Sequence, residues 1–140
     1  MRRYTDITKQ VFLVIAMTSH VLIADRNKSS RDALIAAMPD CWQVNFAEAC
    51  CASDAFAACY AGHAQIMFVD PSLLSAAESA ELMDRVQYSS MTSIIFVSDE
   101  TPEAGSRQAK ASGAIAYLQK PVLRESLEPV LRGCGFLENE

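Results

Sequence analysis

Four short apolar runs constrain the fold of this chain more than any other feature. Each is rich in β-branched side chains and apolar at successive positions, and the runs occupy residues 21–24, 66–69, 94–97 and 114–118. Continuous apolarity over so few residues is typical of strands buried on both faces, whereas a strand with one wet face alternates apolar and polar residues. A weaker fifth run, residues 42–46, carries Gln43 and Asn45 at alternate positions and is predicted to be an edge strand.

Helical patterns fill the intervals between these runs. They span residues 29–38, 48–60, 74–88, 102–112 and 122–132. The first is expected to open with serine caps, and most of the others are bounded by Pro or Gly, which suit helix starts and ends. Strand and helix therefore alternate five times, an order that favours right-handed β-α-β crossovers. The predicted fold class is α/β, with a five-stranded parallel sheet and helices on both faces.

The composition indicates one acidic domain. The 140 residues carry 12 Lys and Arg against 17 Asp and Glu, a formal net charge of −5. We expect no nucleic acid partner, because proteins that bind phosphate backbones usually carry a basic stripe. We also expect no membrane partner, since no apolar run reaches the roughly 18 residues of a membrane span. Five cysteines without regular spacing indicate a reducing compartment, and a cytoplasmic location is expected.

Chemistry is expected where the strands end. In a parallel sheet of this kind, the working crevice lies beyond the carboxyl ends of the strands. Polar residues follow the first, third, fourth and fifth predicted strands, and they are Asp25, Asp70, Ser98 and Lys120. Two carboxylates, a hydroxyl and an ammonium group are therefore predicted to meet in one small space.

The segments around these residues carry a more specific pattern. They read VLIADRNKSSRDAL, IMFVDPSLL, IIFVSDE and AIAYLQKPV. Together they resemble the receiver domains of bacterial two-component response regulators, over about four-fifths of the chain. The resemblance implies a flavodoxin-like receiver fold with the strand order 2-1-3-4-5. It also implies a receiver domain over residues 20–132, between an N-terminal extension (1–19) of unknown role and a C-terminal tail (133–140).

The resemblance assigns roles to individual residues. Asp70 would be the phosphoacceptor, whose carboxylate attacks the phosphorus of a phosphohistidine donor. Lys120 would pair with one phosphoryl oxygen, and Ser98 would donate its hydroxyl to another. Tyr117 resembles the aromatic residue whose inward or outward rotamer follows the movement of that serine.

The implied metal site departs from the family pattern. The Mg²⁺ ligands would be Asp25, Asp70 and the backbone carbonyl of Ser72. Where the family usually has a second acid that binds the metal directly, this chain has Arg26. Arg26 either occupies the metal space and pairs with an acid there, or turns out to solvent and leaves a weakened site. We therefore expect Mg²⁺ to bind weakly, if it binds.

Access to the acceptor is a second departure. Asp99 follows Ser98, where the family usually has a small residue that lets the donor and water reach the acceptor. A carboxylate there is expected to repel phosphoryl donors or to restrict their access. Both departures affect phosphoryl and metal chemistry while the core pattern is intact, so we expect an atypical receiver.

Two functions follow from this pattern. The first is a stand-alone phosphorelay receiver, phosphorylated on Asp70, that switches a docking face made by the fourth helix, the fifth strand and the fifth helix. Its expected partners are a histidine kinase or phosphotransfer protein, and a separate output protein or a second copy of the chain. The alternative is a pseudo-receiver that binds partners independently of phosphate, with Arg26 replacing the metal-ligand acid.

Enzymes on similar folds fit the sequence less well. An aspartyl-phosphate hydrolase usually needs an acid two residues after the nucleophile, where this chain has Ser72. A flavin protein needs a phosphate-binding loop, and no Gly-rich loop follows the first strand. We expect no enzymatic activity beyond self-phosphorylation from a donor and self-dephosphorylation.

Overall fold

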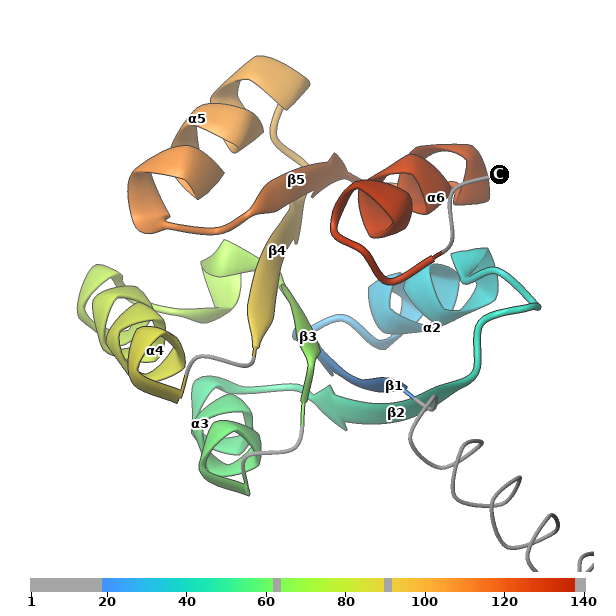
Figure 1. Cartoon of the computed structure of the whole chain (residues 1–140). Coiled ribbons are helices and arrows are strands. Elements are labelled where there is room, and N and C mark those ends of the chain that lie inside the picture. Colours follow the sequence, from blue (N-terminus) through green and yellow to red (C-terminus); the bar gives the residue numbers. More distant parts are fainter. Residues whose placement is uncertain (1–18, 62–63, 90–91, 138–140) are drawn as a thin grey trace, which may run out of the picture.

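A five-stranded parallel sheet forms the centre of the protein (Figure 1). The computed structural model describes residues 19–61, 64–89 and 92–137. The strands are β1 (Ser19–Ala24), β2 (Val44–Ala49), β3 (Ile66–Val69), β4 (Ser93–Ser98) and β5 (Ala116–Gln119). Their order in the sheet is β2-β1-β3-β4-β5, which confirms the predicted fold class and strand order.

Helices cover both faces of the sheet. They are α2 (Lys28–Ala37), α3 (Ala52–Ala61), α4 (Ala76–Ser89), α5 (Pro102–Ser112) and α6 (Arg124–Gly133), with a short 3-10 helix η1 (Pro71–Leu73) after β3. Figure 1 shows α2 and α6 on one side of the sheet and α3, α4 and α5 on the other. None of the helices within the described ranges is long and apolar enough to cross a membrane.

Each central strand contributes side chains to two hydrophobic clusters. In β1, Val21 and Ile23 belong to the cluster under α2 and α6, while Leu22 and Ala24 belong to the cluster under α3, α4 and α5. This follows because successive side chains of a strand point to opposite faces. Continuous apolarity in the sequence therefore reflects a sheet with helices on both sides.

The edge strand β2 is predicted at the correct edge but with the wrong bounds. The sequence predicts this strand at 42–46 and a helix from residue 48, but β2 extends to Ala49 and α3 begins at Ala52. Parallel pairing with β1 continues through Glu48 and Ala49. The sheet hydrogen bonds made by these residues outweigh the helix propensity of Glu and Ala.

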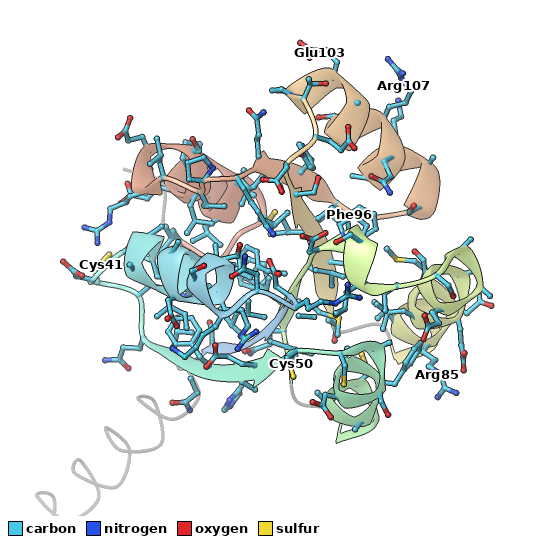
Figure 2. All side chains as sticks on the ribbon, turned by 180° about the vertical axis from the view of Figure 1, so that it is seen from behind. Cys41, Cys50, Arg85, Phe96, Glu103 and Arg107 are labelled. Carbon is cyan, nitrogen blue, oxygen red and sulfur yellow. The ribbon has the colours of Figure 1, made fainter. Side chains whose placement is uncertain are left out.

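The start of α2 differs from the prediction, whereas the bounds of α5 agree with it. The N-cap of α2 is Asn27, whose side chain accepts a hydrogen bond from the Ser29 N–H at 2.9 Å, so the predicted serine caps are wrong. For α5 the predicted bounds are confirmed: Thr101 caps its start, and Gly113 ends it with a left-handed φ of 93°. The exposed side chains of α5 project outward, as Glu103 and Arg107 show in Figure 2.

The predicted terminal segments fall largely outside the described residues. Residues 1–18 of the extension and 138–140 of the tail are not described, and Ser19 already belongs to β1. After α6, Phe136 packs against the cluster under α2 and α6, with its ring centroid 6.3 Å from that of Trp42.

Candidate functional site

Three of the predicted site residues meet at the carboxyl edge of the sheet. Asp25 follows β1, Asp70 follows β3 and Lys120 follows β5. The Nζ of Lys120 lies 2.6 Å from Oδ2 of Asp25 and 2.6 Å from Oδ2 of Asp70. All strands are parallel, so their carboxyl ends reach the same edge, and residues up to 95 positions apart become neighbours. One ammonium group is thus shared by two buried carboxylates.

Both carboxylate oxygens of Asp70 accept hydrogen bonds. Oδ2 accepts from Lys120 at 2.6 Å, and Oδ1 accepts from the Ser72 N–H at 2.9 Å and from the Ser72 hydroxyl at 2.8 Å. Burial alone would raise the pKa of Asp70, but the hydrogen bonds from Lys120 and Ser72 outweigh it and hold that pKa below its ordinary value. Asp70 is therefore an ionised carboxylate at neutral pH.

Lys120 is stabilised in its charged form. Burial lowers the pKa of this ammonium, but its hydrogen bonds with Asp25 and Asp70 outweigh that effect and raise the pKa above its ordinary value. Two carboxylates face a single ammonium, so the site has an excess of negative charge. A further positive group would be attracted to it, and an incoming anion must approach Lys120.

A residue that sequence reasoning missed holds the loop after β1. The Arg31 guanidinium donates to the backbone carbonyl of Asp25 at 2.7 Å, and its Nε pairs with Glu48 of β2 at 2.9 Å. The Asp25 carboxylate also accepts from the Asn27 N–H at 2.9 Å. Arg31 lies in the first turn of α2, where the helix dipole disfavours a positive charge. Lys28 shares this placement, so the sequence signal marks both basic residues and only the structure shows that Arg31 holds the loop.

Arg26 lies away from the carboxylates. Its side chain is exposed, and none of the residues that the structure describes forms a hydrogen bond or ion pair with its guanidinium. The structure thus favours the outward orientation over the one in which Arg26 enters the metal space.

The described residues do not fit a Mg²⁺ site well. The facing oxygens of Asp25 and Asp70 are both bound to the Lys120 ammonium, which lies between them. Arg26 supplies no third carboxylate, and the other oxygen of Asp70, Oδ1, already accepts hydrogen bonds from the Ser72 N–H and hydroxyl. Magnesium prefers an octahedron of oxygen ligands and repels a neighbouring ammonium. We therefore derive no chemical step through a metal ion.

Ser98 and Tyr117 form a hydrogen-bonded pair at the end of β4. The Tyr117 hydroxyl lies 2.6 Å from the Glu100 carbonyl and 3.0 Å from Ser98 Oγ. The short contact to a carbonyl, which can only accept, uses the phenol proton. The Ser98 hydroxyl therefore donates to the Tyr117 oxygen, and its own oxygen accepts from the Glu100 N–H at 3.3 Å. The Tyr117 side chain is therefore turned inward, toward Ser98 and the hydrophobic cluster under α3, α4 and α5.

A cleft of about 250 Å³ opens beside Asp70. It is lined by Asp70, Pro71, Ser72, Ser98, Asp99, Glu100 and Gln108. Asp99 and Glu100 are exposed, so the entrance carries two further carboxylates. A small group can reach Asp70 through this cleft, but an anionic one meets repulsion on the way.

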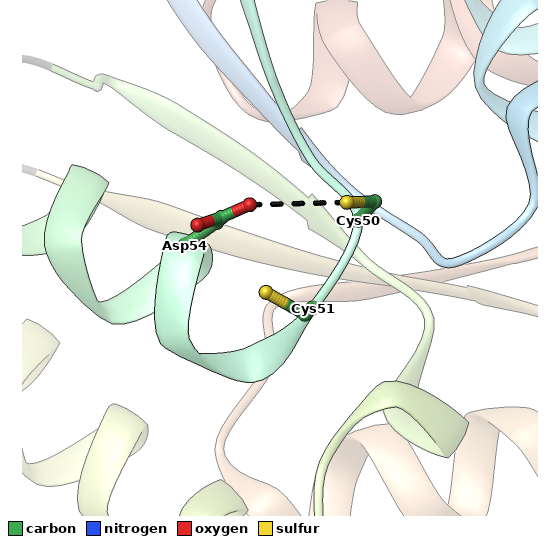
Figure 3. A group of neighbouring side chains, drawn as sticks. All are labelled: Cys50, Cys51 and Asp54. Atoms are coloured by element: carbon green, nitrogen blue, oxygen red, sulfur yellow. Dashed lines mark hydrogen bonds between the residues drawn. The ribbon is translucent and has the colours of Figure 1, made fainter.

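A second group of candidate metal ligands lies at the start of α3. Donor atoms of Cys50, Cys51 and Asp54 all lie within 4.8 Å of one another, and Cys50 Sγ is 3.8 Å from the Asp54 carboxylate (Figure 3). Sequence reasoning did not single out this group. All three residues are exposed, and no buried partner orients them among the residues that the structure describes, so we assign no metal site there.

Comparison with known proteins supports the architecture. No family model matches the chain, and no curated protein matches its sequence. Solved structures do match. A chain described as a pilus assembly protein (CpaE) from Burkholderia thailandensis has a TM-score of 0.70 and 16% identity, covering 85% of this chain and 99% of that one.

Two signalling proteins extend that comparison. A match in the co-crystal structure of the Saccharomyces cerevisiae phosphotransfer protein Ypd1 with the receiver domain of Ssk1 has a TM-score of 0.69 and 21% identity, covering 84% of this chain and 90% of that one. Chemotaxis response regulator CheY4 of Vibrio cholerae has a TM-score of 0.64 and 20% identity, covering 86% of this chain and 99% of that one. At these identities the likeness establishes the receiver fold, and function has to be argued from the site.

Proposed function

We propose that this protein is a phosphorelay receiver in which Asp70 accepts a phosphoryl group from a phosphohistidine donor. The observation that carries the proposal is the 2.6 Å contact between Lys120 Nζ and the Asp70 carboxylate, beside a cleft that Ser98 also lines. An ionised carboxylate next to a fixed ammonium is suited to nucleophilic attack on phosphorus.

The proposed transfer uses groups that are already in place. An Asp70 oxygen attacks the phosphorus, the nitrogen–phosphorus bond of the donor breaks, and the imidazole leaves with its electron pair. The product is an aspartyl phosphate. Lys120 stays beside the acceptor and compensates part of the added negative charge. Oδ1 is the proposed nucleophile, because it faces Ser72, which lines the cleft and whose hydroxyl can rotate away.

The proposed donor is a histidine kinase or a histidine phosphotransfer protein. Support comes from the structural match in a complex of the phosphotransfer protein Ypd1 with the receiver domain of Ssk1. A cytoplasmic location is part of the proposal, because all five cysteines are free, as expected in a reducing compartment. We propose no enzymatic activity beyond this self-phosphorylation and its hydrolytic reversal.

Incubation with a small phosphodonor tests the proposal. Wild type, treated with acetyl phosphate or phosphoramidate with and without Mg²⁺, is expected to gain the mass of one phosphoryl group. Asp70→Asn is expected to gain none, and Asp32→Asn, which changes an exposed acid on α2, should behave as wild type. No gain on wild type, while a responsive receiver is modified alongside, would contradict the proposal.

A second candidate function is a pseudo-receiver that docks partners without phosphate. The contact between Tyr117 and Ser98 favours it, because it uses the hydroxyl that would otherwise bind a phosphoryl group on Asp70. The form in which Arg26 replaces the metal-ligand acid is not supported, because that side chain is exposed. Calorimetric titration with Mg²⁺ bears on this candidate, since tight binding would indicate a functional metal-assisted acceptor.

A further inference from the structure

The ring of Tyr117 occupies a space that exists because residue 105 is a glycine. Gly105 is buried in α5, and a Cβ added there would overlap Cζ and Cε1 of the Tyr117 ring. Side-chain carbons do not approach this closely, and closely packed interiors leave little room for adjustment. Any other residue at position 105 would therefore force the tyrosine ring or the α5 backbone to shift.

The opposite side of α5 does not share this constraint. Gly105 and Ala109, four residues apart, are the buried residues of the helix and lie on one face. Glu103 and Arg107 project from the exposed surface (Figure 2). A glycine inside a helix is normally unfavourable compared with alanine. At position 105 a glycine leaves room for the Tyr117 ring, which explains its place in this helix.

Hydrogen bonds hold the other end of the ring. The Tyr117 hydroxyl donates to the Glu100 carbonyl at 2.6 Å and accepts from the Ser98 hydroxyl. The single proton of Ser98 is thus already used, and it is not available to a phosphoryl group on Asp70 unless the contact with Tyr117 breaks. The space at Gly105 therefore admits the Tyr117 ring, and these hydrogen bonds hold it inward.

We propose that Gly105 is a positioning residue: it leaves the space in which the Tyr117 ring packs inward, where the ring holds the Ser98 hydroxyl and gives the surface formed by α5 and β5 a single form. Asp70 then passes a phosphoryl group along a relay without switching this surface. The relay role rests on the proposed function, whereas the space provided by Gly105 does not depend on it.

A double-mutant cycle tests the contact. Gly105→Ala and Tyr117→Ala are made singly and together, and the unfolding equilibrium is measured in urea. Gly133→Ala is the matched control, because that glycine lies at the end of α6 with nothing within 4 Å of its added Cβ. The control should favour the folded state by up to about fivefold. Gly105→Ala should disfavour it tenfold or more in wild type, and should act like the control when Tyr117 is alanine. An equal penalty in both backgrounds would overturn the proposal.

Ring signals of Tyr117 test the inward state directly. Tyrosine is labelled with ¹³C at the ring ε carbons, and the Tyr117 signal is assigned by its loss in Tyr117→Phe. Gly105→Ala is expected to shift this signal and Gly133→Ala to leave it in place. An unshifted signal in Gly105→Ala would overturn the positioning role.

The same signal separates this proposal from the proposed function. Acetyl phosphate is added while intact mass reports phosphorylation of Asp70. A mass gain with an unmoved Tyr117 signal supports a preset surface, and a mass gain with a moved signal overturns it. No mass gain counts against the proposed function alone, and the comparison of Gly105→Ala with wild type then still decides the positioning role.

Discussion

Lys120 bridges two carboxylates that come from different strands, and this sharing sets the charge of the site. Its ammonium lies 2.6 Å from both Asp25 and Asp70, and all three side chains are largely buried. Removing one partner from a buried ion pair leaves charges that are neither solvated nor compensated. The site is therefore expected to be sensitive to changes that alter its charge but not its shape.

Lys120→Met is expected to destabilise the protein strongly. The variant leaves two buried carboxylates facing each other, at a cost of about 3 kcal/mol in the free energy of unfolding. Urea denaturation measures it. Lys28→Met is the matched control, because Lys28 pairs with Asp32 on the exposed surface of α2 and should contribute little. Equal effects of the two substitutions would contradict this electrostatic account.

Acid should weaken the fold through Asp70, and alkali through Lys120. The pKa of Asp70 is lowered from 3.8, so its contribution is present above that pH and is lost as the pH falls further. The pKa of Lys120 is raised from 10.5, so its contribution is present below that pH and is lost above it. Unfolding free energies measured across pH should form a plateau between these limits. Asp70→Asn should flatten the acid limb, and an unchanged acid limb would contradict the assignment.

Asp99→Asn should speed phosphorylation of Asp70. The substitution removes a negative charge from the cleft entrance, and the rate with acetyl phosphate should rise about twofold to tenfold at low salt. Intact mass measured over time gives the rate. Glu103→Gln, which removes an exposed charge on α5 outside the cleft, is the control. A rate that falls in Asp99→Asn would show that the carboxylate assists the donor.

At the scale of elements, Arg31 connects α2, the loop after β1 and the edge strand β2. It donates to the Asp25 carbonyl and pairs with Glu48, and its side chain is only 12% exposed. Hydrogen bonds from charged donors to partly buried groups contribute more than neutral ones. The loop that carries Asp25 is therefore held from outside by a residue of the following helix.

Arg31→Met should loosen this loop. We expect a loss of about 1–2 kcal/mol in the free energy of unfolding and faster hydrogen exchange at the Asn27 amide, which donates to the Asp25 carboxylate. Arg107→Met, at an exposed position of α5, should leave both measurements unchanged. Unchanged exchange at Asn27 in Arg31→Met would show that the loop is held without the guanidinium.

At the scale of the whole molecule, the three layers divide the cysteines into two classes. Cys41, Cys50 and Cys51 are exposed, while Cys59 and Cys134 are partly buried. Burial raises the pKa of the Cys59 and Cys134 thiols, and the thiolate is the reactive form. Reactivity toward an alkylating reagent thus reports whether the layers are assembled.

Alkylation at mildly alkaline pH should modify three cysteines quickly and two slowly. Mass spectrometry of digested protein identifies the modified sites over time. In urea the two classes should react at similar rates, because unfolding removes the burial of Cys59 and Cys134. Fast modification of Cys59 in the native protein would contradict the described packing of α3.

Sequence patterning predicts the bounds of an element well where the signals that set them lie within the element itself. The run at 66–69 and the helix at 102–112 agree with β3 and α5, because their periodicity and their Pro and Gly boundaries are local properties. The edge strand β2 is different. Residues 48 and 49 join it through pairing with β1, a contact that no local pattern encodes. The convergence of Asp25, Asp70 and Lys120 was predictable, because parallel strands end at one edge.

By itself, the sequence determined the α/β class, the five buried or edge strands and the set of polar residues that gather at their ends. Only the tertiary structure decided where the long side chains point: Arg26 outward, Lys120 between two acids, and Tyr117 inward over Gly105. Periodicity is a property of neighbouring residues, whereas these orientations depend on contacts between elements far apart in the chain. The orientation of these side chains is therefore decided only when the helices pack on the sheet.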